Sequence, residues 1–191
     1  SGRLVVSAPA SFGRQHVAPH IIAFKERYPG LKLSFNFTDS LIDLVSEGYD
    51  MAIRVGEVLN PNYVAIKLFP NRRVVGGTPD YFSRYGVPDT PEDLLDHNCL
   101  AFNLQGGQQG GWTFMRDGRT FSVRVDGDLD CNDGELLYEW VKQGLGVGWR
   151  STWEIQAELK KGTLITVLDE FVAPDYDIHA VYPQQRYLPA K

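Results

Sequence analysis

The stretch LVVSAPASFG, from Leu4 to Gly13, joins an apolar run to the start of a helical pattern. Leu4 to Val6 predicts a strand, and small uncharged residues follow it before the helical pattern begins near Phe12. In an open α/β sheet the carboxyl ends of the strands border the ligand crevice, and helix N-termini there present free N–H groups. The small residues are therefore predicted to leave room for a ligand beside exposed backbone amides.

The residues that follow repeat this order of strand and helix. Apolar residues at steps of four, three and four predict one helical face, made of Val17, Ile21, Phe24 and Tyr28. Alternating apolar and polar residues predict a second strand from Leu31 to Phe37, and the run from Met51 to Val55 predicts a third. Leu41, Leu44 and Val45 predict a short helix between them. The β-α-β-α-β order favours a parallel sheet.

The second part of the chain predicts further strands and helices. Arg72 to Val75 indicates a strand, which the connector Gly76-Gly77 follows, and Asp117-Gly118 indicates a hairpin turn. Three helices are predicted, one opened by Thr90-Pro91-Glu92, one opened by Asn132 to Glu135 and one from about Thr152 to Lys161. The hairpin strands are Trp112 to Met115 and Thr120 to Val125, and the remaining predicted strands are Cys99 to Leu104, Val147 to Trp149, Leu164 to Val167 and Ile178 to Tyr182.

Three predicted junctions place small polar side chains where a strand meets a helix. They lie at Ser7 to Ser11, at Thr38-Asp39-Ser40 and at Asn132-Asp133. One interpretation is a ligand site built from side chains and helix N-termini. The alternative is that these residues are ordinary N-caps, because Ser, Thr, Asp and Asn are the usual caps.

Two arginines are candidate ligand contacts with structural alternatives. Arg54 lies in an apolar strand, where its charge needs either a ligand carboxylate or a pairing with Asp50 or Glu57. Arg150 follows Trp149 at the end of a predicted strand, where a cation and an aromatic ring could line a pocket together. The alternative for Arg150 is a surface side chain lying over the tryptophan.

Composition excludes several classes of protein. Lysine and arginine total 19 against 24 acidic residues, so the formal net charge is −5 and this chain alone is a poor nucleic-acid binder. The absence of a long apolar run and of a signal pattern predicts a soluble, cytoplasmic protein that does not enter a membrane. Cys99 and Cys131 are expected to be unpaired structural thiols, and the alternative is a redox pair. Because metal-ligand spacings, nucleophile motifs and cofactor fingerprints are missing, we expect no metal, no cofactor and no enzymatic activity.

In this order and spacing, the segments resemble the effector-binding domain of the LysR-type transcriptional regulators. The resemblance spans nearly the whole chain. The matching stretches are Arg3 to Pro9, Phe12-Gly13, Ala18-Pro19, Tyr28-Pro29, Asp50 to Gly56, Thr78 to Phe82, Tyr85 to Pro88, Gly144 to Gly148 and Gly162 to Leu164.

The resemblance implies an α/β, two-lobed fold of the type 2 periplasmic-binding-protein kind, in which each lobe is a mostly parallel sheet flanked by helices. Residues 1–72 and a return strand in 173–191 would form lobe I, and residues 73–172 would form lobe II. A small-molecule effector would bind in the cleft between the lobes. By match to the family's pattern it would meet Ala10, Ser11, Thr38, Asp39, Ser40, Asn103, Asn132 and Trp149.

The resemblance also implies partners. Members of the family form homodimers and tetramers through this domain, so Ile22 and Lys25, which lie off the apolar helix face, are candidate interface residues. DNA would be bound only by an N-terminal helix-turn-helix domain, which this chain does not contain. Arg150 departs from the family's common turn, and we hypothesise that it selects an anionic effector, such as an organic acid. The competing class is a periplasmic solute-binding protein of a transport system.

Overall fold

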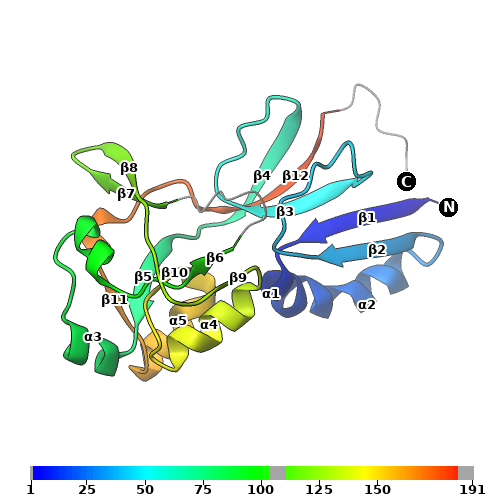
Figure 1. Ribbon diagram of the computed structural model, residues 1–191. Coiled ribbons are helices and arrows are strands. Elements are labelled where there is room, and N and C mark those ends of the chain that lie inside the picture. Colours follow the sequence, from blue (N-terminus) through cyan, green and yellow to red (C-terminus); the bar gives the residue numbers. More distant parts are fainter. Residues whose placement is uncertain (1, 104–110, 185–191) are drawn as a thin grey trace. The chain divides into compact units, whose positions relative to one another are not determined.

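The computed structural model describes residues 2–103 and 111–184 and divides the chain into two compact units (Figure 1). Unit 1 runs to Pro70 and resumes at Asp177, whereas unit 2 is the continuous stretch from Asn71 to Tyr176. The predicted lobes change at residues 72–73 and 172–173, a few residues away from these boundaries. The end of the predicted return segment, residues 185–191, lies outside the described part of the chain.

Unit 1 is built on a five-stranded sheet in the order β2-β1-β3-β12-β4. Its strands are β1 (Arg3–Ala8), β2 (Lys32–Phe37), β3 (Met51–Val55), β4 (Tyr63–Phe69) and β12 (Ile178–Pro183). Strand β1 pairs in parallel with β2 and β3, and β12 pairs antiparallel with both β3 and β4. The last strand of the chain therefore lies inside the sheet, between two strands that precede it by more than a hundred residues.

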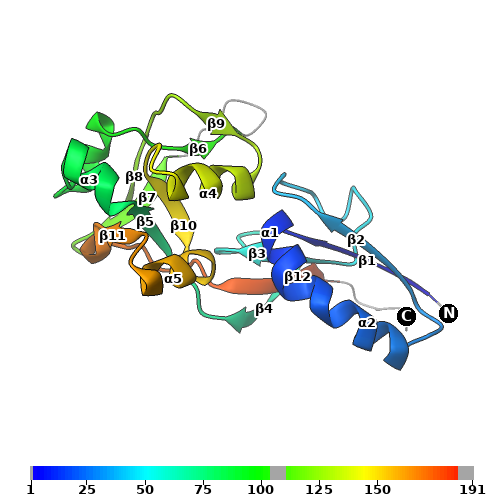
Figure 2. The same ribbon diagram turned by 90° about the horizontal axis from the view of Figure 1, so that it is seen from below.

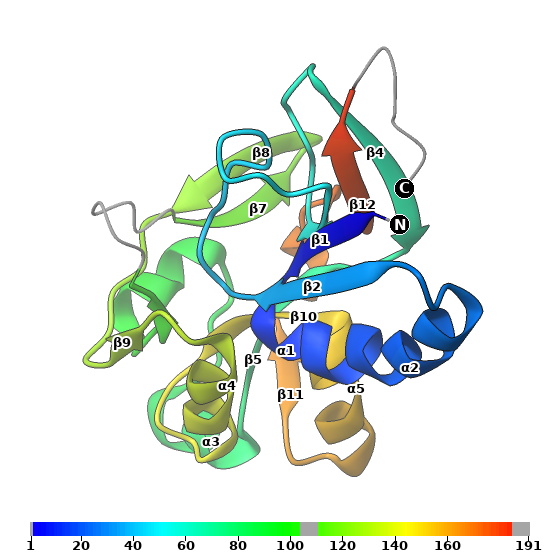
Figure 3. The same cartoon turned by 90° about the vertical axis from the view of Figure 1, so that its right-hand side faces the viewer.

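One face of this sheet carries the first helical segments, as Figures 1 and 3 show. They are α1 (Ala10–Phe12), a π-helical turn (Gly13–Val17) and α2 (Ala18–Arg27). Pro19 lies in the first turn of α2, directly after the π-helical turn. Lys25 satisfies the carbonyls beyond the helix end, because its Nζ donates to the oxygens of Pro29 and Leu31 at 2.7 and 2.6 Å.

The helix predicted at residues 41–48 is wrong. The segment is a series of turns in which Leu44 is buried while Leu41 and Val45 are exposed. The carboxylate of Asp43 accepts hydrogen bonds from the backbone N–H groups of Val45 and Ser46 at 2.9 Å each. Such side-chain bonds compete with a helical ladder, and the apolar spacing alone did not reveal them.

Unit 2 contains a three-stranded antiparallel sheet in the order β10-β5-β11, formed by Gly148–Ser151, Arg73–Gly77 and Ile165–Val167. Helices α4 (Gly134–Lys142) and α5 (Thr152–Lys161) pack on one side of it, around Val74, Val141 and Ile155 (Figure 2). A second apolar cluster joins Val75 to α3 (Pro79–Tyr85), to the 3₁₀ turn Pro91–Asp96 and to a hairpin. The hairpin pairs β7 (Trp112–Arg116) with β8 (Arg119–Val123). Two short strands, β6 (Ala101–Phe102) and β9 (Asp130–Cys131), pair in parallel, and a 3₁₀ turn covers Asp169–Phe171.

The α/β class is confirmed, but the prediction that both sheets are mostly parallel is wrong. Only the β2-β1-β3 part of unit 1 follows the parallel rule, and every pair in the three-stranded sheet of unit 2 is antiparallel. Gly76 and Gly77 are also part of β5 and not a connector. Their missing side chains leave room for Ile155 on one side and Phe82 on the other. None of the helices in the described part combines the length and the apolar character that crossing a membrane requires.

Asn71 links the two places where the chain passes from one unit to the other. Its side chain is buried, and its Nδ2 donates to the carbonyl of Tyr176 at 2.9 Å and to the hydroxyl of Ser151 at 3.2 Å. Its Oδ1 accepts from the Thr152 hydroxyl at 3.1 Å and from the Trp153 N–H at 3.3 Å. The outgoing and returning segments are thus tied to each other and to the start of α5.

Candidate functional site

The first two predicted junctions meet at the carboxyl ends of the parallel strands β1 and β2. Asp39 Oδ1 accepts a hydrogen bond of 3.0 Å from the N–H of Ala10, the first residue of α1. The Thr38 N–H donates to the carbonyl of Ala8 at 2.9 Å, and the Thr38 hydroxyl accepts from the Ser40 N–H at 3.2 Å. The structure therefore brings together the five unit 1 residues predicted from the sequence: Ala10, Ser11, Thr38, Asp39 and Ser40.

Two serine hydroxyls at this junction are buried without a partner among the described residues. They belong to Ser7, which is 0% exposed, and to Ser11, which is 7% exposed. A buried hydroxyl without a hydrogen bond costs free energy, so such groups in native structures call for a partner. This finding argues against an N-cap role for Ser11, because the hydroxyl of a capping serine accepts a hydrogen bond from a backbone N–H.

In unit 2 the ladder of β6 and β9 brings Asn103 close to the residues before α4. The Asn103 N–H donates to the carbonyl of Cys131 at 2.8 Å, and its Nδ2 donates to Asp130 Oδ1 at 3.0 Å. Asn132 is exposed, and the next residue, Asp133, caps α4 by accepting from the Leu136 N–H at 3.0 Å. Asn103 and Asn132 therefore lie at the carboxyl ends of two adjacent parallel strands.

Trp149 packs among aromatic groups of a different part of unit 2. Its ring lies 6.4 Å from that of Trp112 and 5.2 Å from that of Tyr176, measured between centroids. The guanidinium of Arg73 lies over it at 4.9 Å. Because successive side chains of a strand point to opposite faces, this environment lies on the other side of β10 from Arg150. The structure does not group the Trp149 ring with Asn103 and Asn132.

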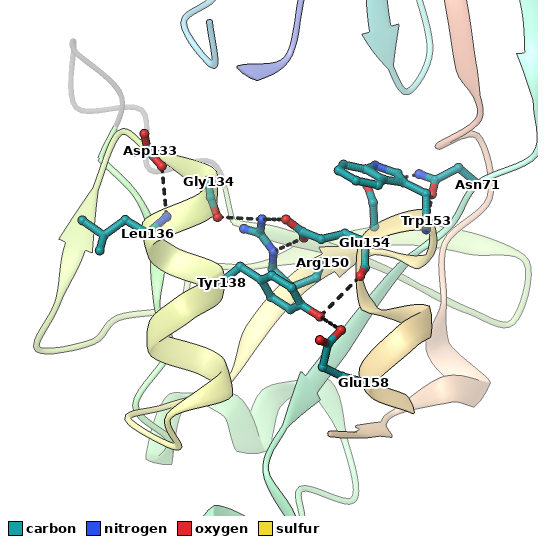
Figure 4. A network of polar contacts seen from close by, with 10 residues as sticks. Asn71, Asp133, Gly134, Leu136, Tyr138, Arg150, Trp153, Glu154 and Glu158 are labelled. Carbon is teal, nitrogen blue, oxygen red and sulfur yellow. Dashed lines mark hydrogen bonds and ion pairs between the residues drawn. The ribbon is translucent and has the colours of Figure 1, made fainter. Parts of the chain in front are cut away.

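Arg150 is buried in a polar network of unit 2, which Figure 4 shows. Its Nε and Nη2 donate to the two carboxylate oxygens of Glu154 at 2.7 and 2.8 Å, and Nη2 also donates to the carbonyl of Gly134 at 2.9 Å. The neighbouring Tyr138 hydroxyl donates to Glu158 Oε2 at 2.6 Å. Burial, together with this carboxylate, raises the pKa of Tyr138. The alternative of a surface arginine over Trp149 is wrong, and the Arg150 guanidinium is already paired with a carboxylate of the protein.

Arg54 is half-buried in β3, and its described hydrogen bond runs from Nη2 to the carbonyl of Ile42 at 3.3 Å. Burial lowers the pKa of Arg54, and the charge of Glu47 acts in the opposite direction. Asp50, one of the two expected partners, accepts a hydrogen bond from the Val5 N–H at 2.8 Å. The choice between a structural and a ligand-binding role for Arg54 stays a prediction.

The sequence interpretation missed Asn71, Tyr138 and Glu154. A signal existed for Glu154, because Ser151 to Glu154 has the S-x-x-E spacing of a capping box. Ser151 is the N-cap of α5 but makes no side-chain capping bond, and Glu154 instead turns to Arg150. The capping-box pattern thus indicated that Glu154 makes a specific contact, but it predicted Ser151 as the partner, whereas the partner is Arg150.

A comparison with protein-family models matches the LysR substrate binding domain over residues 1–191. The chain belongs to the LysR family. It is the effector-binding regulatory domain of a LysR-type transcriptional regulator, a family without enzymatic activity. This membership decides against the solute-binding protein of a transport system.

Curated LysR-type relatives extend beyond this domain. The transcriptional regulator DmlR of Escherichia coli K12 is 34% identical over 190 residues, which is 100% of this chain and 62% of DmlR. The transcriptional activator TtdR of the same strain is 33% identical over 186 residues, which is 97% of this chain and 60% of TtdR. The chain therefore spans about three-fifths of the length of these relatives.

Solved structures agree with the LysR assignment. The regulatory domain of CrgA from Neisseria meningitidis is 27% identical, with a TM-score of 0.74 over 96% of this chain and 89% of that one. The regulatory domain of AphB from Vibrio vulnificus shares the fold, with a TM-score of 0.76 at 22% identity over 96% of this chain and 91% of that one. The predicted fold family is therefore confirmed.

Proposed function

We propose that this domain senses a small organic effector, which its full-length protein converts into a change in DNA binding. The observation that carries the proposal is the buried, unpartnered hydroxyl of Ser11 beside the two junctions of unit 1. The proposed contacts are Ser11, Ala10, Thr38, Asp39 and Ser40 in unit 1, and Asn103, Asn132 and Trp149 in unit 2. DNA would be bound by a helix-turn-helix domain outside this chain, which places the proposed protein in the cytoplasm.

The environment of the junction favours an effector that both donates and accepts hydrogen bonds. The N–H of Ala10 already donates to the Asp39 carboxylate, so an entirely anionic ligand would meet a negative charge there. A hydroxyl group could donate to Asp39 and accept from Ser11. Among organic acids, we therefore propose one that also carries a hydroxyl or amide group.

Thermal melting against a panel of small organic acids, hydroxy acids and amino acids tests this proposal. A ligand at 100 times its dissociation constant stabilises the fold by about 2.7 kcal/mol, which raises the melting temperature by several degrees. We expect the shift to be lost in Ser11→Val and in Thr38→Val and kept in Ser34→Val, a strand serine of β2 whose hydroxyl accepts from Arg3. A ligand whose stabilisation survives both junction variants would refute the proposed site.

We propose that α2 forms the interface of a homodimer. Ile22 is 71% exposed on this helix, so a second chain that covers it would remove apolar surface from water. Lys25, the second predicted interface residue, uses its ammonium group to cap the end of α2, so we assign it to the rim. Sedimentation velocity should show a dimer for the natural sequence and a monomer for Ile22→Asp, and an unchanged mass in that variant would contradict the interface.

A further inference from the structure

We propose that Arg150 is a positioning residue of the effector site: held by Glu154, its guanidinium fixes the chain segments that carry Asn103, Asn132 and Trp149. The proposal rests on the proposed function, because these three residues are its effector contacts in unit 2. It replaces the hypothesis that Arg150 itself binds an anion.

Arg150 contacts the segments of Asn103 and Asn132 and directly follows Trp149 in the chain. The Phe102 ring, next to Asn103, lies 5.9 Å from the guanidinium carbon, within the range of a cation–π interaction. The carbonyl of Gly134, two residues after Asn132, accepts from Nη2 at 2.9 Å. Trp149 is the preceding residue of β10, whose backbone is held in the sheet by its pairing with β5.

Glu154 holds the guanidinium in one orientation. The side chains of Arg150 and Glu154 are only 9% and 6% exposed, and their two parallel hydrogen bonds form a bidentate pair. The Tyr138 ring lies 5.6 Å from the guanidinium carbon, so its position is limited on another side as well. Lysine, a point charge with a flexible stem, could not reproduce this fork.

The start of α5 gives the pair a fixed base. Glu154 lies in the first turn of this helix, where a carboxylate is favoured by the helix dipole. Asn71 binds the residues just before it, through the Ser151 and Thr152 hydroxyls and the Trp153 N–H. Figure 4 shows how these contacts connect the start of α4 with the start of α5 through Arg150.

A buried ion pair is often no more stabilising than an apolar pair of the same volume. This principle separates positioning from stability in a single variant. In Arg150→Met/Glu154→Met, apolar side chains fill the space of the ion pair, so the urea midpoint of unfolding should be close to that of the natural sequence. The hydrogen bond from Arg150 Nη2 to the carbonyl of Gly134 is nevertheless lost, so the segments around Asn103 and Asn132 should loosen.

Amide hydrogen exchange on this chain measures the loosening without an effector. In Arg150→Lys and in the double methionine variant, we expect the N–H of Asn103 and of Leu136 to exchange about tenfold faster, the factor that a modest local opening produces. The hairpin Trp112–Val123 should keep its protection. Arg116→Lys is the matched control, because Arg116 forms a bidentate pair with Glu92 on the surface, with bonds of 2.9 and 2.7 Å.

Two results would overturn the positioning role. One is unchanged protection of both amides in both variants, and the other is an equal rise in the hairpin, which would indicate general loosening. Either result leaves the effector site of unit 1 standing, because the Ser11→Val and Thr38→Val experiment tests that separately.

Glu154→Gln distinguishes positioning from direct contact with any acid of the panel that stabilises the chain. If Arg150 positions the site, the variant binds that acid more weakly. If Arg150 contacts the acid, freeing its charge makes binding tighter, and this would also overturn the proposal.

Discussion

Gly76→Ala should destabilise unit 2, and Ile155→Val should restore much of the loss. An added Cβ at Gly76 would lie 2.5 Å from Ile155 Cδ1, which is closer than any ordinary contact, and 3.5 Å from the carbonyl of Ile165. The single serious overlap is therefore with one methyl group. Ile155 is fully buried between α5 and the sheet, so it has little room to move.

The magnitude follows from three effects. Overpacking a core costs about 1 to 3 kcal/mol. Replacing a glycine at an ordinary backbone conformation returns about 0.4 to 1 kcal/mol by restricting the unfolded chain. We therefore expect a net loss of about 1 to 2 kcal/mol for Gly76→Ala. Ile155→Val alone removes Cδ1 and should cost about 0.5 to 1.5 kcal/mol.

The double variant should lose less free energy of unfolding than the two single variants lose together, because the new Cβ occupies the space that Cδ1 leaves. Contacting residues show interaction energies of about 0.5 to 3 kcal/mol, and we expect about 1 to 2 kcal/mol here. Urea unfolding followed by tryptophan fluorescence is suited to this measurement, because all four tryptophans, at positions 112, 140, 149 and 153, lie in unit 2. With a slope of about 2 kcal/mol/M, a 2 kcal/mol loss lowers the midpoint by about 1 M.

Gly30→Ala is the control, because an added Cβ there meets nothing within 4 Å. Its effect should be small, and far-UV circular dichroism can follow it because unit 1 contains no tryptophan. Strict additivity of Gly76→Ala and Ile155→Val would refute the reasoning, since it would mean that Ile155 does not limit the space at Gly76.

Three further outcomes are expected. Tyr138→Phe should lower the free energy of unfolding by about 1.5 to 3 kcal/mol, as expected for a hydrogen bond to a charged group, and a change below 0.5 kcal/mol would argue against the bond to Glu158. The hydrogen-bonded ion pair with Arg116 lowers the pKa of the Glu92 carboxyl to about 2. This ion pair therefore stabilises the fold above pH 4.5 and ceases to do so as the pH falls towards 2. Glu92→Gln should therefore flatten the acid side of the stability curve, and an unaltered curve would count against the pair. Burial raises the pKa of the Cys99 thiol to about 12, so at pH 8 a thiol reagent should modify only the partly exposed Cys131 until urea unfolds the chain.

Regular elements were predictable where burial follows a simple period. Alternating apolar residues identified β2, and the first and last residues of α5 coincide with those expected from the sequence. Strand β4 was missed because most of its residues are exposed, so its side chains carry no pattern of burial. Strand β9 has only two residues, fewer than any period needs.

The candidate site was predictable in part, for a geometric reason. Parallel strands end at the same edge of a sheet, so the junctions after β1 and β2 had to meet, and Ala10 does bind Asp39. The role of Arg150 was not predictable in the same way. Its partner Glu154 lies four residues away across a change from strand to helix, and only the local path of the chain determines whether the two side chains meet.

The position of β12 inside the sheet of unit 1 has a consequence for synthesis on the ribosome. Among the described strands, β4 joins the sheet through β12 alone, and roughly 110 residues separate the two, about 5 to 20 s of translation. Unit 2 is complete in sequence by Tyr176, before β12 has emerged. The sequence of unit 2 is therefore complete on the nascent chain before that of unit 1, and until then the edges of β3 and β4 that β12 later covers have no β12 to pair with.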